Sequence, residues 1–119
     1  MSVVHLATFM SPSTNIGCMI IAGTARCDIK HKSWSLPPRP SACPPIVDFG
    51  QGLIVTGSGP GRLVCAGDTS LDPSAKVLPY DTDTAVGAFH CQSRTDGMTC
   101  TNTSTGHGFF ISIQSYRAF

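Results

Sequence analysis

The chain has 119 residues, enough for one domain with a modest core and too few for two. Apolar residues make up 41% of it and charged residues only 13%, about half the usual share, with a net charge of +1. The basic residues are scattered and no apolar run is long, so we expect neither a nucleic-acid partner nor a membrane span. Every acid is Asp, and Ser, Thr, Gly and Pro are abundant, which favours strands and turns over helices.

The first element is a predicted β-hairpin at residues 14–29. A β-prone apolar run leads into Ala22-Gly23, which suits a two-residue turn, and a second β-prone run follows. A turn at this place sets Cys18 opposite Cys27 on neighbouring antiparallel strands. There the separation of their Cβ atoms suits a disulfide.

Residues 30–45 differ in composition, because they hold five of the nine prolines of the chain. Proline keeps the backbone extended and removes the amide that a central strand would donate. We therefore expect a proline-rich wrap that lies along the core and is fixed by a disulfide at Cys43. Proline-rich segments also bind aromatic-lined grooves of other proteins, and this is the alternative.

The rest of the chain predicts two further hairpins. Residues 48–66 predict a central hairpin, whose glycine-rich loop lacks the Lys-Ser/Thr pair and the following helix of a phosphate-binding loop. Residues 67–85 are rich in turn formers. Residues 86–119 predict a last hairpin and a closing strand, with Asp96-Gly97 as a strong turn signal.

The six cysteines predict a disulfide framework. Two pairs share a spacing of eight intervening residues with a turn in the middle, which favours cross-strand disulfides, and the third pair follows by elimination. The expected pairs are Cys18–Cys27, Cys91–Cys100 and Cys43–Cys65. Six cysteines allow 15 pairings, and free buried thiols are the remaining alternative. We therefore predict a single domain over residues 1–119: an all-β, disulfide-stapled sandwich or barrel-like fold of about seven short strands with the proline-rich wrap.

Disulfides form in oxidising compartments, so the framework predicts an extracellular or cell-envelope location. The first ten residues lack the basic start and the long apolar stretch of a signal peptide. We therefore expect a leader outside this chain or another route of export, with a virion surface as the alternative location.

Short strings along nearly the whole chain match a known family. They include Arg26-Cys-Asp-Ile29, Pro37-Pro-Arg-Pro-x-x-Cys43, Val64-Cys-Ala-Gly-Asp-Thr69, Leu78-Pro-Tyr80 and Thr105-Gly-His-Gly-Phe109. Together they resemble a family of small secreted or lipoprotein-like domains of mycobacteria and related actinobacteria, for which no activity is established. The resemblance implies an exported protein with three paired cysteines, in an actinobacterium or a phage of such a host, and it carries over no catalytic residue. Members usually have glycine after the Leu-Pro-Tyr string, where this chain has Asp81.

No motif in the sequence assembles a catalytic group, a metal-ligand set or a cofactor site, so we expect none of these. His107 stands between two glycines and is the best candidate for a general base, but no motif sets Asp68, Asp96 or Ser112 beside it. The candidate partner-binding residues are aromatic or basic side chains in proline-rich, turn-rich or glycine-flanked segments: Trp34, Arg39, Tyr80 and His107.

The leading hypothesis is an exported, non-enzymatic protein that binds or scaffolds a protein or an envelope component, at the actinobacterial envelope or a particle surface. One alternative is a small secreted hydrolase that uses His107. Another is an inhibitor of a secreted protease that acts through an exposed, disulfide-held loop. A pocket that joins His107 to a Ser or Asp would favour the hydrolase, and a projecting extended loop would favour the inhibitor.

Overall fold

The structure, a computed structural model, describes residues 2–119. Within this range the chain forms strands and turns and no helix. The strands, in chain order, are β1 (Ser2–Val4), β2 (Thr8–Met10), β3 (Ile16–Ile21), β4 (Thr24–Ile29), β5 (Asp48–Val55), β6 (Arg62–Ala66), β7 (Lys76–Val77), β8 (Thr82–Val86), β9 (Phe89–Arg94), β10 (Gly97–Asn102), β11 (Gly108–Ile111) and β12 (Tyr116–Ala118).

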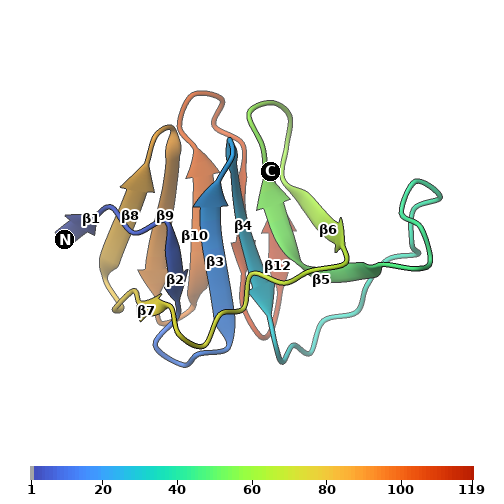
Figure 1. Cartoon of the computed structure of the whole chain (residues 1–119), viewed down its shortest axis with the longest axis horizontal. Helices are drawn as coiled ribbons and strands as arrows, with labels where there is room; N and C mark the ends of the chain where they lie inside the picture. Colours follow the sequence, from blue (N-terminus) through green and yellow to red (C-terminus); the bar gives the residue numbers. More distant parts are fainter. Residues whose placement is uncertain (1) are drawn as a thin grey trace.

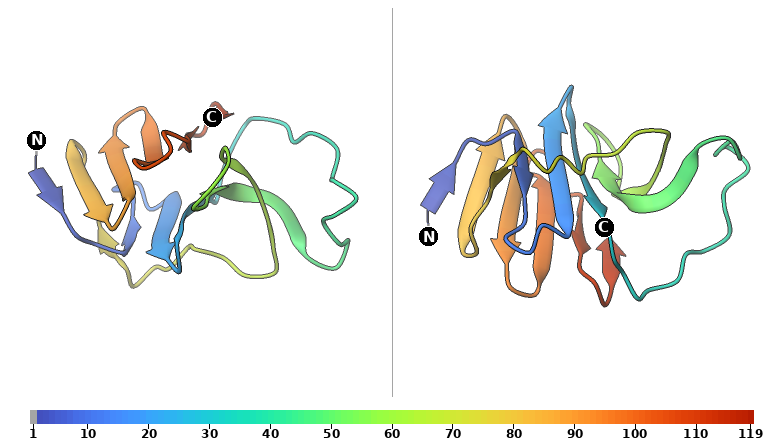
Figure 2. Two further views of the ribbon diagram at one scale, coloured as in Figure 1. Left: turned by 90° about the horizontal axis from the view of Figure 1, so that it is seen from above. Right: turned by 60° about the horizontal axis from the view of Figure 1, so that its bottom comes forward.

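Two six-stranded sheets pack face to face as a sandwich (Figures 1 and 2). The strand order is β1-β8-β9-β10-β11-β12 in the first sheet, sheet A, and β6-β5-β4-β3-β2-β7 in the second, sheet B. Neighbouring strands are antiparallel except at two sheet edges, where β1 joins β8 and β2 joins β7 in parallel. The predicted all-β, sandwich-like fold is confirmed.

The number of strands differs from the prediction, since residues 2–119 form twelve rather than about seven. Four of them, β1, β2, β7 and β12, have only two or three residues, too few to show an alternation of apolar and polar positions. Strand β8 lies partly in the section predicted to be turn-rich. Its buried positions are the polar residues Asp83 and Thr84, so the sequence lacks the buried apolar residues by which a strand is predicted.

The two hairpins with equally spaced cysteines are β3–β4 and β9–β10. The register of β3–β4 sets Cys18 opposite Cys27, and that of β9–β10 sets Cys91 opposite Cys100. A disulfide joins each pair across the strands, with a Cα–Cα distance of 4.1 Å in both. The turn residues therefore determine which cysteines meet.

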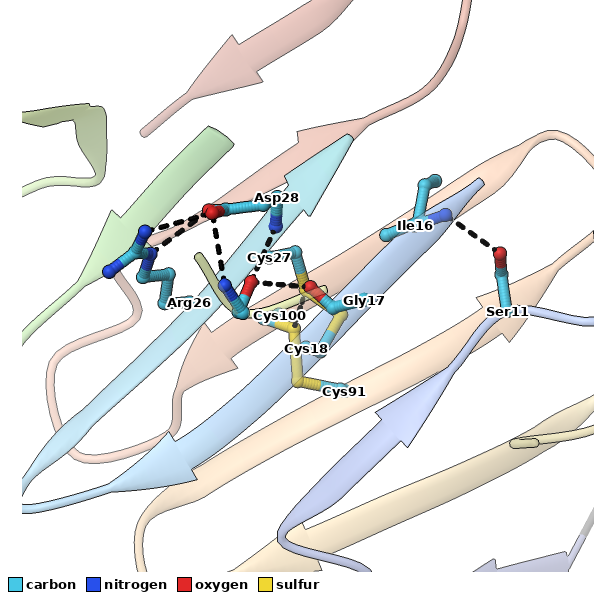
Figure 3. Close-up of a disulfide and its surroundings, with 10 residues drawn as sticks. Ser11, Ile16, Gly17, Cys18, Arg26, Cys27, Asp28, Cys91 and Cys100 are labelled. Atoms are coloured by element: carbon cyan, nitrogen blue, oxygen red, sulfur yellow. Dashed lines mark hydrogen bonds and ion pairs between the residues drawn. A yellow bond between two sulfur atoms is a disulfide. The ribbon is translucent and has the colours of Figure 1, made fainter. Parts of the chain in front are cut away.

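The two cross-strand disulfides meet at the centre of the sandwich (Figure 3). Sγ of Cys27 lies 3.7 Å from Sγ of Cys100, which is van der Waals contact between the two sheets. All four of these half-cystines are at most 1% exposed. Apolar side chains from both sheets surround them, among them Phe9, Leu53, Leu78, Met98, Phe109 and Ile111. The sulfur atoms thus fill the middle of a small core, so these disulfides both cross-link the chain and contribute to core packing.

A strap, residues 67–75, crosses the outer face of sheet B and covers a pair of charges (Figure 1). The carboxylate of Asp28 accepts a bond from Arg26 at 2.8 Å (Figure 3) and another from the backbone amide of Ser70 at 3.1 Å. Arg26 also donates to the carboxylate of Asp68 in the strap at 2.8 Å. The strap therefore satisfies buried charges whose burial without partners would be costly.

Residues 30–45 do not form the predicted wrap. The chain leaves the sandwich after β4 and returns at β5 as a mostly exposed loop that stands beside the sheets (Figures 1 and 2). Its fixed points are Trp34, Leu36, which packs on β5, and Cys43, which forms a disulfide with Cys65 of β6 over a Cα–Cα distance of 5.9 Å. The other side chains are mainly Pro, Ser and Ala, which offer too little apolar surface to hold the backbone against a sheet. We call residues 30–47 the projecting loop.

Candidate functional site

Five turns gather at one end of the sandwich, the lower end in Figure 1, which we call the loop end. They are residues 11–15, 30–33, 78–81, 94–97 and 112–115. They meet because each follows a strand that ends here. Three of these strands, β2, β4 and β7, belong to sheet B, and two, β9 and β11, belong to sheet A. Four of the turns enclose an open cleft of about 160 Å³, the loop-end cleft.

The inner side of the loop-end cleft consists of buried polar side chains that are already hydrogen-bonded. Ser93 donates to the carbonyl of Leu78 at 3.0 Å and so ties the 94–97 turn to the 78–81 turn. Asn15 donates from its side chain to the carbonyl of His31 at 3.0 Å and accepts from the His31 amide at 2.9 Å. Since these groups have partners, this part of the cleft is rigid and holds its shape without a ligand.

The rim of the cleft is different. Tyr80 is 41% exposed and Ile113 is 45% exposed, so an aromatic ring and an aliphatic side chain face solvent beside the opening. The rim side chains of Thr95, Asp96 and Gln114 are also exposed, and none of the three has a side-chain hydrogen bond to another described residue. The rim therefore offers apolar surface together with free donors and acceptors.

A second hollow of about 370 Å³ adjoins the cleft. Ile113 and Asn15 line both cavities, and Lys30 and His31 line only the second one. The two hollows are therefore neighbours on one surface, with Ser13, Asn15 and Ile113 lining both.

Two strained residues lie in these turns: Thr14 lines the second hollow, and Asp81 directly follows Tyr80 of the cleft. Thr14 and Asp81 each have a φ of 62°, in the left-handed region that residues other than glycine rarely adopt. The turn at Asp81 thus keeps the conformation that suits the glycine expected from the family resemblance. Strain of this kind persists only where the surrounding structure enforces it, and it is enriched at binding and active sites.

A charged cluster lies behind the 94–97 turn. The carboxylate of Asp83 accepts bonds from His90 and from Arg94, each at 2.8 Å. Burial alone would raise the pKa of Asp83, but the hydrogen bonds from His90 and Arg94 outweigh it and lower that pKa. Asp83 is therefore a carboxylate at neutral pH, and it holds Arg94 at the edge of the cleft.

The structure separates the four predicted partner-binding residues, and only Tyr80 lies in the cleft. Trp34 is half-buried: its ring packs against that of Tyr116 at an angle of 53° with centroids 4.5 Å apart, and its Nε1 donates to the carbonyl of Ser112 at 2.8 Å. Trp34 thus supports the 112–115 turn from behind. Arg39 lies in the projecting loop, where its Nη1 donates to the carbonyl of Val47 at 2.8 Å.

His107 lies at the opposite end of the sandwich, on the turn between β10 and β11 (Figure 1). Its backbone amide donates to Thr105 Oγ1 at 3.2 Å within the same turn. In the range 2–119 its ring makes no hydrogen bond to a hydroxyl or a carboxylate. Nothing in this geometry assembles a general base with a nucleophile.

The sequence did not point to Ile113, Arg94 or Gln114. Ile113 continues the apolar run of the closing strand, and only the turn closed by Ser112 and Ser115 exposes it. The only sequence feature that could have indicated these residues is the pattern of turn-forming residues. That pattern predicts where each turn lies in the chain, but not which turns come together at one end of the molecule.

Three sulfurs, those of Cys18, Cys27 and Cys100, lie within 4.8 Å of one another and resemble a metal-ligand group. All three belong to disulfides, so they offer no thiolate to a metal ion. Three disulfides in a small domain also suggest an oxidising, extracellular environment.

Residues 2–119 contain no helix with the length and apolar character to cross a bilayer. No curated protein and no solved structure matches the chain significantly. A family model matches residues 3–119, nearly the whole chain, and it describes a family of unknown function, DUF6636. The chain therefore belongs to the family DUF6636.

Proposed function

We propose that this protein is an exported, non-enzymatic binding protein of the actinobacterial envelope, and that its loop-end cleft binds the end of a saccharide chain. The observation that carries the proposal is the juxtaposition in the cleft of the exposed ring of Tyr80 with unpaired polar side chains above a rigid, hydrogen-bonded inner side. The envelope and the actinobacterial host come from the family resemblance and from the disulfides. A particle surface in a phage of such a host is the other setting.

The chemistry of the cleft fits an uncharged, polyhydroxylated ligand. An aromatic ring offers an apolar face to the C–H groups of a sugar, and a few placed polar groups fix its hydroxyls. The two charged residues that line the cleft, Arg94 and Asp96, have opposite formal charges, and Arg94 is also paired with Asp83. A cavity of about 160 Å³ is smaller than sites that enclose a drug-sized molecule, but it admits a single ring, and the second hollow can receive the next one.

The test uses the folded protein and soluble oligosaccharides of arabinose, galactose, mannose and N-acetylglucosamine. We expect at least one of them to shift the backbone amide resonances of residues 80, 94–97 and 112–114 in two-dimensional NMR spectra. Tyr80→Ala should abolish the shifts, and Tyr80→Phe, which keeps the ring, should weaken binding only severalfold.

His107→Ala is the matched control, because His107 lies at the other end of the sandwich and is also half-exposed on a turn. It should bind as the wild type does. Shifts confined to residues outside the loop end, or equal binding by wild type and Tyr80→Ala, would overturn the proposal, as would the absence of shifts with all four sugars.

A second candidate function, inhibition of a secreted protease, is favoured by the projecting loop. This loop stands away from the sheets, is mostly exposed, and is held near one end by the disulfide of Cys43 (Figure 2). Ile46 beyond that disulfide is 91% exposed. An extended, tethered loop of this kind enters a protease cleft at low cost in conformational entropy.

The inhibitor hypothesis is tested with a trypsin-like and a subtilisin-like serine protease. It predicts slow-release inhibition of at least one of them, lost in Ile46→Asp and retained in Ile21→Asp, a control at another exposed apolar position. Rapid cleavage of the loop by both proteases without inhibition rules out the inhibitor.

A further inference from the structure

The Cys43–Cys65 disulfide lies in a setting unlike that of the other two. Cys65 is exposed on β6, whereas Cys43 is only 4% exposed, and both cysteines line an open groove of about 460 Å³ between the projecting loop and strands β5 and β6. The half-cystines of the core are at most 1% exposed. A thiolate in solution can therefore reach the Cys65 side of this disulfide while the sandwich stays folded.

An arginine lies beside the sulfur of Cys43. Nη1 of Arg39 is 3.4 Å from Sγ of Cys43, and hydrogen bonds to the carbonyls of Pro44 at 3.0 Å and Val47 at 2.8 Å hold the guanidinium in place. A guanidinium at this distance stabilises a thiolate. Exchange is faster when the departing sulfur leaves as a stabilised thiolate, so Cys43 is the better leaving group and the exposed Cys65 is the sulfur to be attacked.

We propose that Cys65 is a thiol-exchange site, at which a low-molecular-weight thiol forms a mixed disulfide and releases the projecting loop. The thiol first loses its proton to solvent, and the thiolate sulfur then bonds to Sγ of Cys65. The bond between the two protein sulfurs breaks, and its electron pair stays on Cys43 as a thiolate beside Arg39. A second thiolate can attack the mixed disulfide, so that two thiols are oxidised to their own disulfide while one protein disulfide is reduced to two cysteines.

Exchange changes the groove and spares the sandwich. Pro40, Ala42 and Cys43 form the wall of the groove that belongs to the loop, and after exchange no covalent bond holds that wall to β6. Trp34 still anchors the start of the loop through its bond to Ser112. The groove therefore widens on one side only. This inference is independent of the saccharide proposal, because it concerns the far edge of sheet B.

The experiment exposes the intact, folded protein to 2-mercaptoethanol for increasing times, quenches with acid, and alkylates free thiols with iodoacetamide before peptide mass spectrometry. We expect the mercaptoethanol adduct on Cys65 and alkylation on Cys43, with both core disulfides intact over the same period. An adduct on Cys43, no adduct at all, or equally fast reaction of the core disulfides would overturn the proposal.

Variants at Arg39 test the part assigned to the leaving thiolate. Arg39→Gln should slow exchange at Cys65 by about threefold to tenfold, and Arg39→Lys, which keeps the positive charge, should restore most of the rate. Arg117→Gln on β12 changes the net charge equally and should leave the rate unchanged. If Arg39→Gln instead reacts as fast as the wild type or faster, Arg39 only holds the loop and the assigned role is wrong.

Discussion

The centre of the sandwich and the projecting loop are both cross-linked by disulfides, yet the links do different things. At the centre, two disulfides lie in van der Waals contact between the sheets and are sealed from solvent. At the loop, one disulfide, with Cys65 exposed and Cys43 buried, ties a segment with few apolar contacts to the edge of sheet B. A disulfide stabilises by restricting the unfolded chain, but its neighbours decide whether it is also part of the core or only a tether.

The largest expected effect comes from removing one core disulfide and comparing it with removal of the tether. Cys91→Ala with Cys100→Ala should lower the free energy of unfolding by about 4 kcal/mol, from the lost cross-link and the cavity left in the core. Cys43→Ala with Cys65→Ala should cost about 1–2 kcal/mol, because the released loop gains freedom in the folded state as well as in the unfolded one.

Urea denaturation of the two double variants measures both values. In the chain-entropy model alone, the tether closes the longer loop and should be the more stabilising link, since its sequence separation is 22 against 9. Equal losses, or a greater loss for the tether, would contradict the distinction between core link and tether.

The buried charges under the strap give the next effect. Arg26→Ala leaves the carboxylate of Asp28, whose side chain is 1% exposed, without its cationic partner, and should cost about 3 kcal/mol. Asp68→Asn removes the partner that is 71% exposed and should cost less than about 1 kcal/mol. Thermal unfolding of both variants measures the difference. If their melting temperatures fall by similar amounts, the prediction that the buried pair contributes more stability is wrong.

Within the projecting loop, the anchored and the free positions should also differ. Trp34→Ala removes a ring packed against Tyr116 and should cost about 2 kcal/mol. Ile46→Ser, at a position that is 91% exposed, should change stability by less than about 0.5 kcal/mol. Chemical denaturation distinguishes the two, and a large loss in Ile46→Ser would mean that the loop packs on the sandwich after all.

The smallest effect is a dependence on pH. Because the pKa of Asp83 is lowered in the folded state, its ionised form adds stability at neutral pH, and that stability is lost as the pH falls below about 4 and through the lowered pKa. Asp83→Asn should cost about 1 kcal/mol at pH 7 and nearly nothing at the acid end. If wild type and variant differ by the same amount at every pH, the carboxylate adds nothing through its charge.

The parts of the fold set by local chemistry could be predicted from the sequence. Ala22-Gly23 forms the first hairpin turn, and Thr95-Asp96 forms the second, one residue before the Asp96-Gly97 signal. These turns bring the cysteines of each hairpin into register. The contact between the two disulfides could not be predicted, because it depends on how two sheets pack. The strap was missed for the same reason, since the bond between Ser70 and Asp28 joins segments 42 residues apart.

The candidate site was only partly predictable. Tyr80 could be singled out as an aromatic residue in a turn-rich section, but its neighbours in the cleft come from turns far apart in the sequence. Whether Trp34 packs inward or faces a partner could not be predicted, because composition does not tell whether an aromatic side chain finds a neighbour such as Tyr116. The proline-rich segment does not wrap the core as predicted. Proline content predicts an extended backbone, but it does not predict whether that backbone lies along the sheets or away from them.

The difference between the sealed core and the tethered loop is tested most directly by amide hydrogen exchange of the folded protein before and after treatment with 2-mercaptoethanol. We predict faster exchange after treatment only in residues 36–50 and 62–66, with unchanged protection in β3, β4, β9 and β10. A rise in exchange throughout those four strands, or no change at the loop, would contradict it.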